Sequence, residues 1–358
     1  MTTDKLKVGI IGAGVGRAHA EGYAASPRVE IVGIAGLDDE RVQALARRFN
    51  VPHTYREYAD MLAVPEIDAV SIAVPNALHA PVTIAALEAG KHVLVEKPLA
   101  RNATEGRAMV EAAKKAGKVL MVSFNHRQRN DVQWLRQYVE SGALGKVYYA
   151  KAYWMRRKGI PGLGSWFVNK EQAGGGPLID LGVHILDIAM FLLGEPTPVA
   201  VSANTYAEFG PRGLKGWETK RSTGQSVHYE VEDLATAFIR LESGATLLLE
   251  ASWATHSSAG DDYGVVLYGT EGGAELTIKN YGHENTIRLF TDVNGVPFES
   301  MPFVPKGGGH SQVVERFIAA ILDGAPAIPG AGEGLLRAEV IDACYRSAEA
   351  GREVRIEP

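Results

Sequence analysis

The chain has 358 residues, enough for two domains of ordinary size. Hydrophobic residues make up 46 % of it and charged residues 22 %, which predicts a packed core and excludes a disordered chain. The 37 Lys and Arg against 42 Asp and Glu give a net charge of −5, so we expect neither nucleic acid nor a membrane surface as a partner. No signal-peptide pattern and no apolar run of ~20 residues stands out, and the single cysteine, Cys344, cannot form an intramolecular disulfide. We therefore expect a cytoplasmic protein of two domains.

Residues 1–125 alternate short apolar runs with amphipathic helical stretches. Continuous apolar runs are typical of strands buried on both faces, and their alternation with helices predicts a doubly wound α/β domain around a parallel sheet. The expected strands cover residues 6–11, 29–34, 67–74, 92–96 and 119–123, and the expected helices residues 17–25, 39–49, 77–89 and 104–116.

Residues 126–358 have a different pattern. Strand-like runs follow one another with turn signals between them, such as Glu242-Ser243-Gly244, which predicts an antiparallel or mixed sheet in an α+β domain. The expected strands include residues 146–155, 234–241, 245–252, 264–268 and 286–290, and the expected helices cover residues 180–193, 311–322 and 333–350.

A glycine loop, Gly12-Ala13-Gly14-Val15-Gly16, joins the first strand to the first helix. Backbone N–H groups in such a loop can meet a pyrophosphate at the positive end of the helix, so Gly12, Gly14, Val15 and Gly16 are candidate cofactor contacts. The third glycine of the usual pattern falls on Arg17, one position after Gly16. An ordinary tight turn remains the alternative interpretation.

The end of the second strand bears on the choice of dinucleotide. Gly36 stands at the strand end, and Asp38 just beyond it is the candidate partner of the adenosine ribose. Asp38 and Asp39 would repel a 2′-phosphate, and Arg41 falls inside the next helix, so we favour NAD without excluding NADP. Asp38 or Asp39 could instead be only the N-cap of that helix.

Three short segments resemble one protein family. They are residues 74–79 (VPNALH), residues 90–98 (GKHVLVEKP) and residues 175–184 (GGPLIDLGVH). Together and in this order, they resemble the Gfo/Idh/MocA oxidoreductases, the relatives of glucose–fructose oxidoreductase and inositol dehydrogenase. The resemblance extends over essentially the whole chain.

This resemblance implies an architecture and an activity. An α/β Rossmann domain over residues 1–125 would bind NAD(P). An α+β domain over residues 126–358, with a large and predominantly antiparallel open sheet, would bind substrate and form homodimers or homotetramers. The implied substrate is a sugar, a polyol or a related compound.

The resemblance also implies roles for individual residues. Lys97 falls on the family's catalytic lysine, and Asp180 and His184 fall on its acid and its histidine. The residues that it places along the cofactor are Gly12, Gly14, Gly16, Pro75, Asn76, His79, Glu96 and Lys97.

The chemistry of alcohol oxidation suits these three side chains. Asp180 and His184 stand at i and i+4 of a predicted helix, which puts them on one face about 6 Å apart along its axis. A histidine steadied by a carboxylate can take the hydroxyl proton, and a lysine ammonium can stabilise the developing alkoxide. Considered singly, Asp180 could be a helix-start acid, His184 a core histidine and Lys97 a surface lysine.

Substrate contacts are the least defined part of the site. Asn125 and Arg127 follow the last expected strand of the first domain, at the edge where ligands bind. Tyr153, Arg156 and Trp166 are candidates in the second domain, as are Asp180 and His184 themselves, although an aromatic strand is more often simple core. His310, after three glycines, could be a helix-entry residue or a substrate contact. We expect no metal site, because no metal-ligand spacing is present.

The sequence therefore predicts an NAD(P)-dependent dehydrogenase that oxidises a secondary hydroxyl of a sugar, glycoside or cyclic polyol. One rival is a glycosidase that retains NAD, oxidises the sugar transiently and eliminates the glycosidic substituent. Relatives of that kind tend to lack the lysine, so Lys97 argues against it. A second rival is a cofactor-binding regulator without turnover, and the intact set of Lys97, Asp180 and His184 argues against that.

Overall fold

The computed structural model describes residues 5–216 and 228–356, and the chain divides into two compact units. The first consists of Met1–Gln128 and Gly308–Ala338, and the second of Arg129–Gly307 and Glu339–Pro358. A single boundary after residue 125 was expected from the sequence. The structure instead packs residues 308–338 with the first unit.

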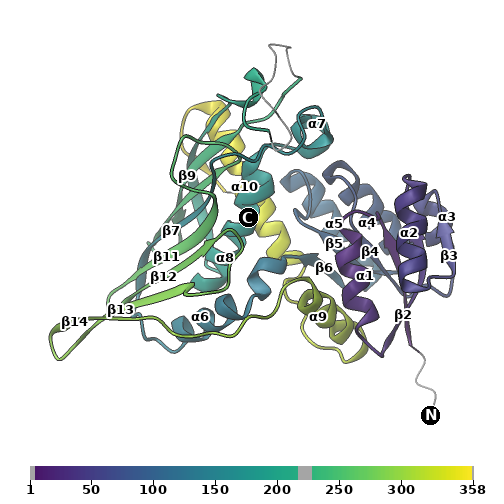
Figure 1. Ribbon diagram of the computed structural model, residues 1–358, viewed down its shortest axis with the longest axis horizontal. Coiled ribbons are helices and arrows are strands. Elements are labelled where there is room, and N and C mark those ends of the chain that lie inside the picture. Colours follow the sequence, from purple (N-terminus) through teal and green to yellow (C-terminus); the bar gives the residue numbers. More distant parts are fainter. Residues whose placement is uncertain (1–4, 217–227, 357–358) are drawn as a thin grey trace. The chain divides into compact units, whose positions relative to one another are not determined.

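The first unit is built on a parallel sheet of six strands in the order β3-β2-β1-β4-β5-β6 (Figure 1). This is the strand order of a Rossmann fold, so the expectation of a doubly wound α/β domain is confirmed. Sequence analysis overlooked β3, which is three residues long and lacks an apolar run. The strands are β1 (Leu6–Ile11), β2 (Val29–Ala35), β3 (His53–Tyr55), β4 (Ala69–Ile72), β5 (His92–Glu96) and β6 (Leu120–Ser123).

Helices cover both faces of this sheet (Figure 1). On one face α1 packs with α2 and α9, and on the other α4 packs with α3 and α5. Gly22 of α1 leaves room for Val314 of α9, because a Cβ there would lie 2.9 Å from the valine side chain. Phe317 of α9 is fully buried in the same core. These contacts explain why residues 308–338 belong to this unit. The helices are α1 (Gly16–Ala24), α2 (Asp39–Phe49), α3 (Tyr58–Leu62), α4 (His79–Glu88), α5 (Ala103–Ala116) and α9 (His310–Leu322).

The second unit is built on a sheet of nine strands in the order β14-β13-β12-β11-β7-β10-β9-β8-β15 (Figure 1). Strands β7 and β10 pair in parallel, and the other described pairs are antiparallel, so the expected large, predominantly antiparallel sheet is confirmed. The strands are β7 (Val147–Arg156), β8 (Pro198–Tyr206), β9 (Leu234–Leu241), β10 (Thr246–Ser252), β11 (Asp261–Gly269), β12 (Gly273–Lys279), β13 (Ile287–Val293), β14 (Val296–Ser300) and β15 (Val354–Arg355).

Helix α8 (Val183–Leu193) packs against β7 and β11, and α6 (Asn130–Glu140) packs on α8. The alternation of β7 follows from this cover, because Ala152, Trp154 and Arg156 are buried on one face while Tyr153 points to the other. Short helix α7 (Lys170–Ala173) precedes the start of α8 in the chain. The last helix, α10 (Ala331–Ala350), begins in the first unit and ends in the second, where Cys344 is fully buried.

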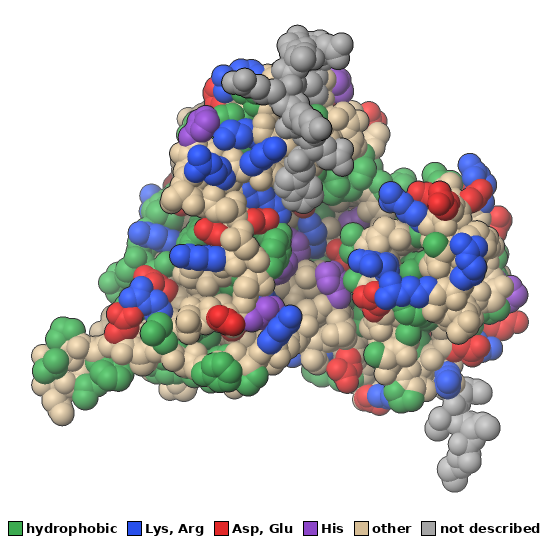
Figure 2. Space-filling model, viewed as in Figure 1, with side chains coloured by type: hydrophobic (Ala, Val, Ile, Leu, Met, Phe, Trp, Pro, Cys, Tyr) green, Lys and Arg blue, Asp and Glu red, His purple; other side chains and the backbone are tan. Residues whose placement is uncertain are grey.

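The stretch Lys170–Leu193 is 24 residues long and, by length and composition, apolar enough to cross a membrane. It is not a continuous apolar run, because polar residues and glycines interrupt it. In the structure 83 % of its most apolar window is buried inside the fold, as in the core helix of a soluble protein. On the face shown in Figure 2, basic and acidic side chains are interspersed among the described residues.

Candidate active site

The glycine loop follows the carboxyl end of β1. Gly12 has a φ of +99°, and a Cβ there would lie 2.1 Å from the carbonyl oxygen of Ala73. Gly14 faces open space, which lets a ligand approach its backbone, and a Cβ on Gly16 would lie 2.8 Å from Ile10. These are the three tasks of glycine in a dinucleotide-binding loop: a tight turn, a close ligand approach and close packing of helix on strand. Among the described residues, α1 also begins with neither a capping side chain nor an acidic first turn, as an anion site requires.

At the carboxyl end of β5, the Glu96 carboxylate is held by two histidines. His19 Nε2 of α1 donates to Glu96 Oε1 at 2.8 Å, and His310 Nε2 of α9 lies 3.8 Å from the same oxygen. Burial raises the pKa of Glu96, but the hydrogen bond from His19 and the charges of both histidines outweigh it and lower the pKa to about 2. His310 is therefore a partner of Glu96 in the first unit.

The ligand atoms of His19, Glu96 and His310 lie within 4.8 Å of one another, a donor set that could also hold a divalent ion. Sequence analysis expected no metal because no metal-ligand spacing is present, and these three residues are separated by long stretches of chain. Only the fold brings them to one sheet edge, so no short spacing could have revealed the group.

Lys97 and His79 lie beside this carboxylate. Lys97 is half-buried and follows directly on β5, where its peptide bond to Pro98 is cis. His79 is buried at the start of α4, its Nδ1 2.7 Å from the Pro98 carbonyl and its Nε2 3.0 Å from the Val74 carbonyl. Burial lowers the pKa of His79. The imidazole thus links the ends of β4 and β5, and Asn76, in the same connection, is also buried.

Asp38 performs the role that sequence analysis left as its alternative. It is the N-cap of α2, and its carboxylate accepts the N–H of Arg41 at 3.1 Å. The Arg41 side chain is exposed, and its Nε lies 3.1 Å from Asp38 Oδ2. A cation therefore stands beside the acid, which weakens the repulsion that a 2′-phosphate would meet.

Arg127 corrects a prediction. Its side chain is fully buried, and Nη1 donates to Glu333 Oε1 at 2.9 Å, so the guanidinium is not offered to a substrate. A buried Arg–Glu pair costs too much desolvation to open for each substrate molecule. Asn125 is half-exposed at the carboxyl end of β6.

In the second unit, Asp180 and His184 share one helix start. Sequence analysis expected a regular α-helix from Asp180, whereas the structure has a π-helical turn at Leu178–Gly182 that continues into α8. π-Helical turns are rare and frequently mark functional sites. Asp180 is half-exposed and His184 is buried, with its ring 5.7 Å from that of Trp154.

Trp253 holds the Asp180 carboxylate, and sequence analysis missed it. Its indole Nε1 donates to Asp180 Oδ2 at 2.9 Å, although 73 positions separate the two residues in the chain. Trp253 follows β10 and is fully buried. A tryptophan directly after a strand resembles ordinary core, so its pattern carries no functional signal.

Arg156 extends this site along β7. Its Nε donates to Asp261 Oδ2 at 2.8 Å and its Nη2 to the Tyr281 hydroxyl at 2.9 Å. Burial lowers the pKa of Arg156, but Tyr281, Asp261 and Asp180 together raise it, so the guanidinium stays charged near Asp180. Sequence analysis proposed Arg156 but missed Asp261 and Tyr281, which come from β11 and the turn after β12.

Tyr153, a candidate substrate contact from sequence analysis, lies on a different face of β7 from the residues that pack near His184. Side chains alternate along β7, so Tyr153 lies on the opposite face of the sheet from Trp154 and Arg156. Trp166 is half-exposed in the connection before α7, and its ring stacks on Phe167 at 3.9 Å. The structure thus groups Asp180, His184 and Arg156 in the second unit, while Lys97 and the glycine loop belong to the first.

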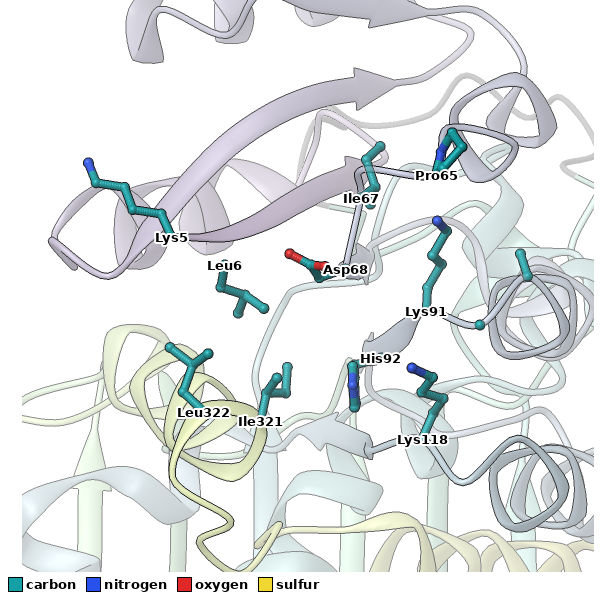
Figure 3. A pocket seen from close by; sticks show the side chains of 12 residues that line it. Lys5, Leu6, Pro65, Ile67, Asp68, Lys91, His92, Lys118, Ile321 and Leu322 are labelled. Carbon is teal, nitrogen blue, oxygen red and sulfur yellow. The ribbon is translucent and has the colours of Figure 1, made fainter. Parts of the chain in front are cut away.

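A hollow of about 550 Å³ opens at the other edge of the parallel sheet, where the strands begin (Figure 3). Three lysines and Asp68 line it. Lys91 donates to the Val64 carbonyl at 2.7 Å, and Asp68 accepts the backbone N–H of Lys7 at 2.9 Å. Because Lys91 and Asp68 already have protein partners, and open parallel sheets bind ligands at the opposite edge, we do not place the site here.

Comparison with known proteins matches both units to one family. Residues 6–124 match the model of the oxidoreductase family with an NAD-binding Rossmann fold, and residues 132–275 match the GFO/IDH/MocA C-terminal domain. The D-glucoside 3-dehydrogenase of Escherichia coli (strain K12) is 35 % identical over 99 % of both chains. This chain belongs to the Gfo/Idh/MocA oxidoreductase family.

Other members of the Gfo/Idh/MocA family agree with this assignment. The levoglucosan dehydrogenase of Pseudarthrobacter phenanthrenivorans is 32 % identical over 96 % of both chains. A solved levoglucosan dehydrogenase in complex with NADH superposes with a TM-score of 0.86 at 28 % identity, over 99 % of both chains. The predictions of the family, of an oxidoreductase and of an NAD-binding Rossmann domain are confirmed.

Proposed function

We propose that this protein is an NAD-dependent dehydrogenase that oxidises a secondary hydroxyl of a sugar, glycoside or cyclic polyol, with NADP not excluded as its cofactor. The observation that carries the proposal is the helix start in the second unit. There Asp180 and His184 stand one turn apart, and Trp253 donates to the Asp180 carboxylate at 2.9 Å. A carboxylate held in this way and a histidine one turn along the helix are equipped to move a hydroxyl proton.

The first unit fits a bound dinucleotide. A Cβ on Gly12 would collide with Ala73, the backbone at Gly14 is open, and α1 begins without a side-chain cap among the described residues. Bound NAD would supply the hydride acceptor. Gly12, Gly14, Val15 and Gly16 would hold its pyrophosphate, and Pro75, Asn76 and Glu96 would border it, with His79 fixing the backbone beneath them.

The proposed chemistry requires one proton acceptor and one cation. His184 accepts the proton of the substrate hydroxyl while hydride leaves the same carbon, so the alcohol loses two electrons and two hydrogens and becomes a ketone. Asp180 orients the imidazole and hydrogen-bonds the substrate, and Lys97 stabilises negative charge on the reacting oxygen. Each step uses a side chain that sequence analysis singled out.

The substrate class rests on relatives and on the polar face beside Asp180. The relatives with named activities include dehydrogenases of a D-glucoside, levoglucosan, D-apiose and scyllo-inositol. Arg156 and Trp154 are on the same face of β7 as the buried helix, and they offer a guanidinium and an aromatic ring, the groups that bind sugar hydroxyls and ring faces. Asn125 and Trp166 remain candidate substrate contacts.

The test measures two products of the same incubation, reduced nicotinamide and cleaved glycoside. Purified protein is incubated with glucosides, levoglucosan, free sugars and inositols under NAD and NADP separately, and reduced nicotinamide is followed by absorbance. A substrate-dependent signal that disappears in His184→Gln supports the proposal. Glycoside cleavage without net reduction of NAD would replace it by the NAD-retaining glycosidase. A parallel incubation with chelator tests whether the His19–Glu96–His310 group needs an ion.

We also propose that the chain forms a homo-oligomer through its large sheet and resides in the cytoplasm. The β13–β14 hairpin exposes Val293, Val296 and Phe298 by 49, 63 and 51 %, and Figure 2 shows hydrophobic side chains gathered at this end of the second unit. Exposed apolar patches of this kind favour association. Solution mass before and after Phe298→Glu tests the oligomer. The lone cysteine, which is buried and free, agrees with a reducing compartment.

A further inference from the structure

A buried carboxylate, Glu232, lies beneath the helix start that carries Asp180. Its Oε2 accepts the backbone N–H of Gly176 at 2.9 Å and its Oε1 that of Leu178 at 3.1 Å. The Tyr345 hydroxyl of α10 donates to Oε1 at 2.9 Å. Leu178 opens the π-helical turn and Gly176 stands just before its cap, so Glu232 accepts N–H groups at a helix start, where partners inside the helix are lacking.

The position of this carboxylate explains why residues 175 and 176 are glycines. A Cβ on Gly176 would lie 2.1 Å from the Glu232 carbonyl oxygen and 3.1 Å from its carboxyl carbon. A Cβ on Gly175 would lie 2.0 Å from the Tyr345 hydroxyl. The two glycines thus leave room for Glu232 and Tyr345 to reach the helix start, so this part of the motif serves the support of Asp180.

Glu232 is itself buried and hydrogen-bonded. Its side chain is 7 % exposed, and the Tyr229 hydroxyl donates to its carbonyl at 3.0 Å. Burial raises its pKa, and the two backbone N–H groups and the Tyr345 hydroxyl oppose that shift. Three donors converge on this carboxylate, so its two oxygens are held by hydrogen bonds to these groups.

We propose that Glu232 is a positioning residue of the dehydrogenase: it fixes the first turn of the helix, and through it the place of the Asp180 carboxylate and the His184 imidazole. The inference rests on the proposed function of this pair. Two anchors then define the Asp180 side chain, the backbone bonds to Glu232 on one side and the Trp253 indole on the other.

The expected effect is on the rate. Glu232→Gln preserves the size of the side chain but turns an amide NH₂ toward a backbone N–H, so one of the two backbone bonds is replaced by a clash of donors. Misplacement of reacting groups by about 1 Å costs on the order of 100-fold in rate. We expect kcat to fall by at least tenfold, whereas the KM for NAD, whose binding loop belongs to the other unit, stays within about twofold.

Asp233→Asn is the matched control. Asp233 is the neighbouring buried carboxylate, and its Oδ2 accepts the backbone N–H groups of Phe209 at 2.6 Å and Gly210 at 3.0 Å. Both substitutions replace a carboxylate that accepts two backbone N–H groups by an amide, but of these two side chains only that of Glu232 accepts from the Asp180 helix start. Equal losses of kcat in the two variants, at equal folded fractions, would overturn the proposal. Tyr345→Phe, which spares both backbone bonds, should lower kcat by less than Glu232→Gln.

A second readout does not depend on turnover. The indole N–H signal of Trp253, assigned with Trp253→Phe in protein carrying ¹⁵N-labelled tryptophan, reports the hydrogen bond to Asp180. We expect the signal to move in Glu232→Gln, and an unchanged signal would overturn the positioning role. If the wild-type protein oxidises none of the sugars while this signal moves, the proposed function fails but the positioning of Asp180 by Glu232 stands.

Discussion

In the first unit, the candidate site residues reach one sheet edge because parallel strands end there, whereas in the second unit they share one helix start that distant side chains hold in place. Gly12, Lys97 and Asn125 each follow the carboxyl end of a strand. Asp180 instead depends on Trp253 and on the carboxylate of Glu232.

Because of this difference, we expect substitutions to affect the two groups of residues in different ways. A site set by strand ends is fixed by the backbone, so substitutions there act through steric conflict and cofactor affinity. A site set by hydrogen bonds between side chains loses precision when one donor is removed, so substitutions there act through rate. The following experiments separate the two behaviours.

The largest effect is expected for the proposed catalytic groups, one from each unit. Lys97→Ala and His184→Gln should each reduce kcat by about 10²–10⁴-fold, because proton transfer and charge stabilisation are lost. Lys114→Ala, which removes an exposed lysine of α5, serves as the control and should leave kcat unchanged. Steady-state kinetics by NADH absorbance measures all three, and wild-type kcat in either test variant would refute its assigned role.

The next largest effect is the loss of folding stability at low pH, and it arises from Glu96 in the first unit. The pKa of Glu96 is about 2 in the folded protein against 4.5 ordinarily, so its contribution to stability is present above pH 4.5 and is lost as the pH falls toward 2. The pKa difference corresponds to about 3 kcal/mol of unfolding free energy. Urea unfolding between pH 6 and pH 3 should therefore show a steeper loss in the wild type than in Glu96→Gln. Parallel curves would contradict the expectation.

Two histidines, the buried His79 and the half-buried His310, add to acid sensitivity at higher pH. Burial lowers the pKa of both His79 and His310 below the ordinary value of 6.5. The unfolded chain therefore binds more protons below that pH, and stability falls as the pH drops through this range. Comparison of Glu96→Gln with the wild type separates the carboxylate's part from this background.

Trp253→Phe should give an intermediate effect in the second unit. The substitution keeps an aromatic ring in the core but removes the donor to Asp180, and a hydrogen bond to a charged group contributes about 1.5–3 kcal/mol. We expect kcat/KM for the sugar to fall by about 10–100-fold while NAD affinity is retained. Trp134→Phe, at a half-buried tryptophan of α6 that stacks on Tyr138, is the control. Equal losses in the two variants would show that packing alone explains the result.

The smallest effect is expected at the end of β2. Asp38→Ser retains an N-cap for α2 but removes the negative charge beside Arg41. An exposed charge of this kind contributes about 0.2–1 kcal/mol, so the preference for NAD over NADP should drop by up to about fivefold. Kd values for both cofactors, measured by quenching of tryptophan fluorescence, decide this. An unchanged ratio would remove Asp38 from cofactor selection.

The sequence predicts most of the first unit because its signals are local. Apolar runs, the glycine loop and the spacing of Asp180 and His184 each fall within a few residues, where periodicity and turn chemistry act. Trp253 lies 73 positions from Asp180, and His19 lies 77 from Glu96, so only the folded chain unites them. Arg127 shows the opposite failure, since its place after a strand suggested a ligand contact although its guanidinium is buried against Glu333.

The packing of α9 on α1 has a consequence for synthesis on the ribosome. Val314 and Phe317 complete the core around the first parallel sheet, yet they are made after almost all of the second unit. The amino-terminal part therefore emerges with an unfinished core and must remain open to a late segment, although domains generally fold in the order in which they are synthesised. Nascent chains arrested before residue 308 should accordingly be more sensitive to protease in α1 than chains released at full length.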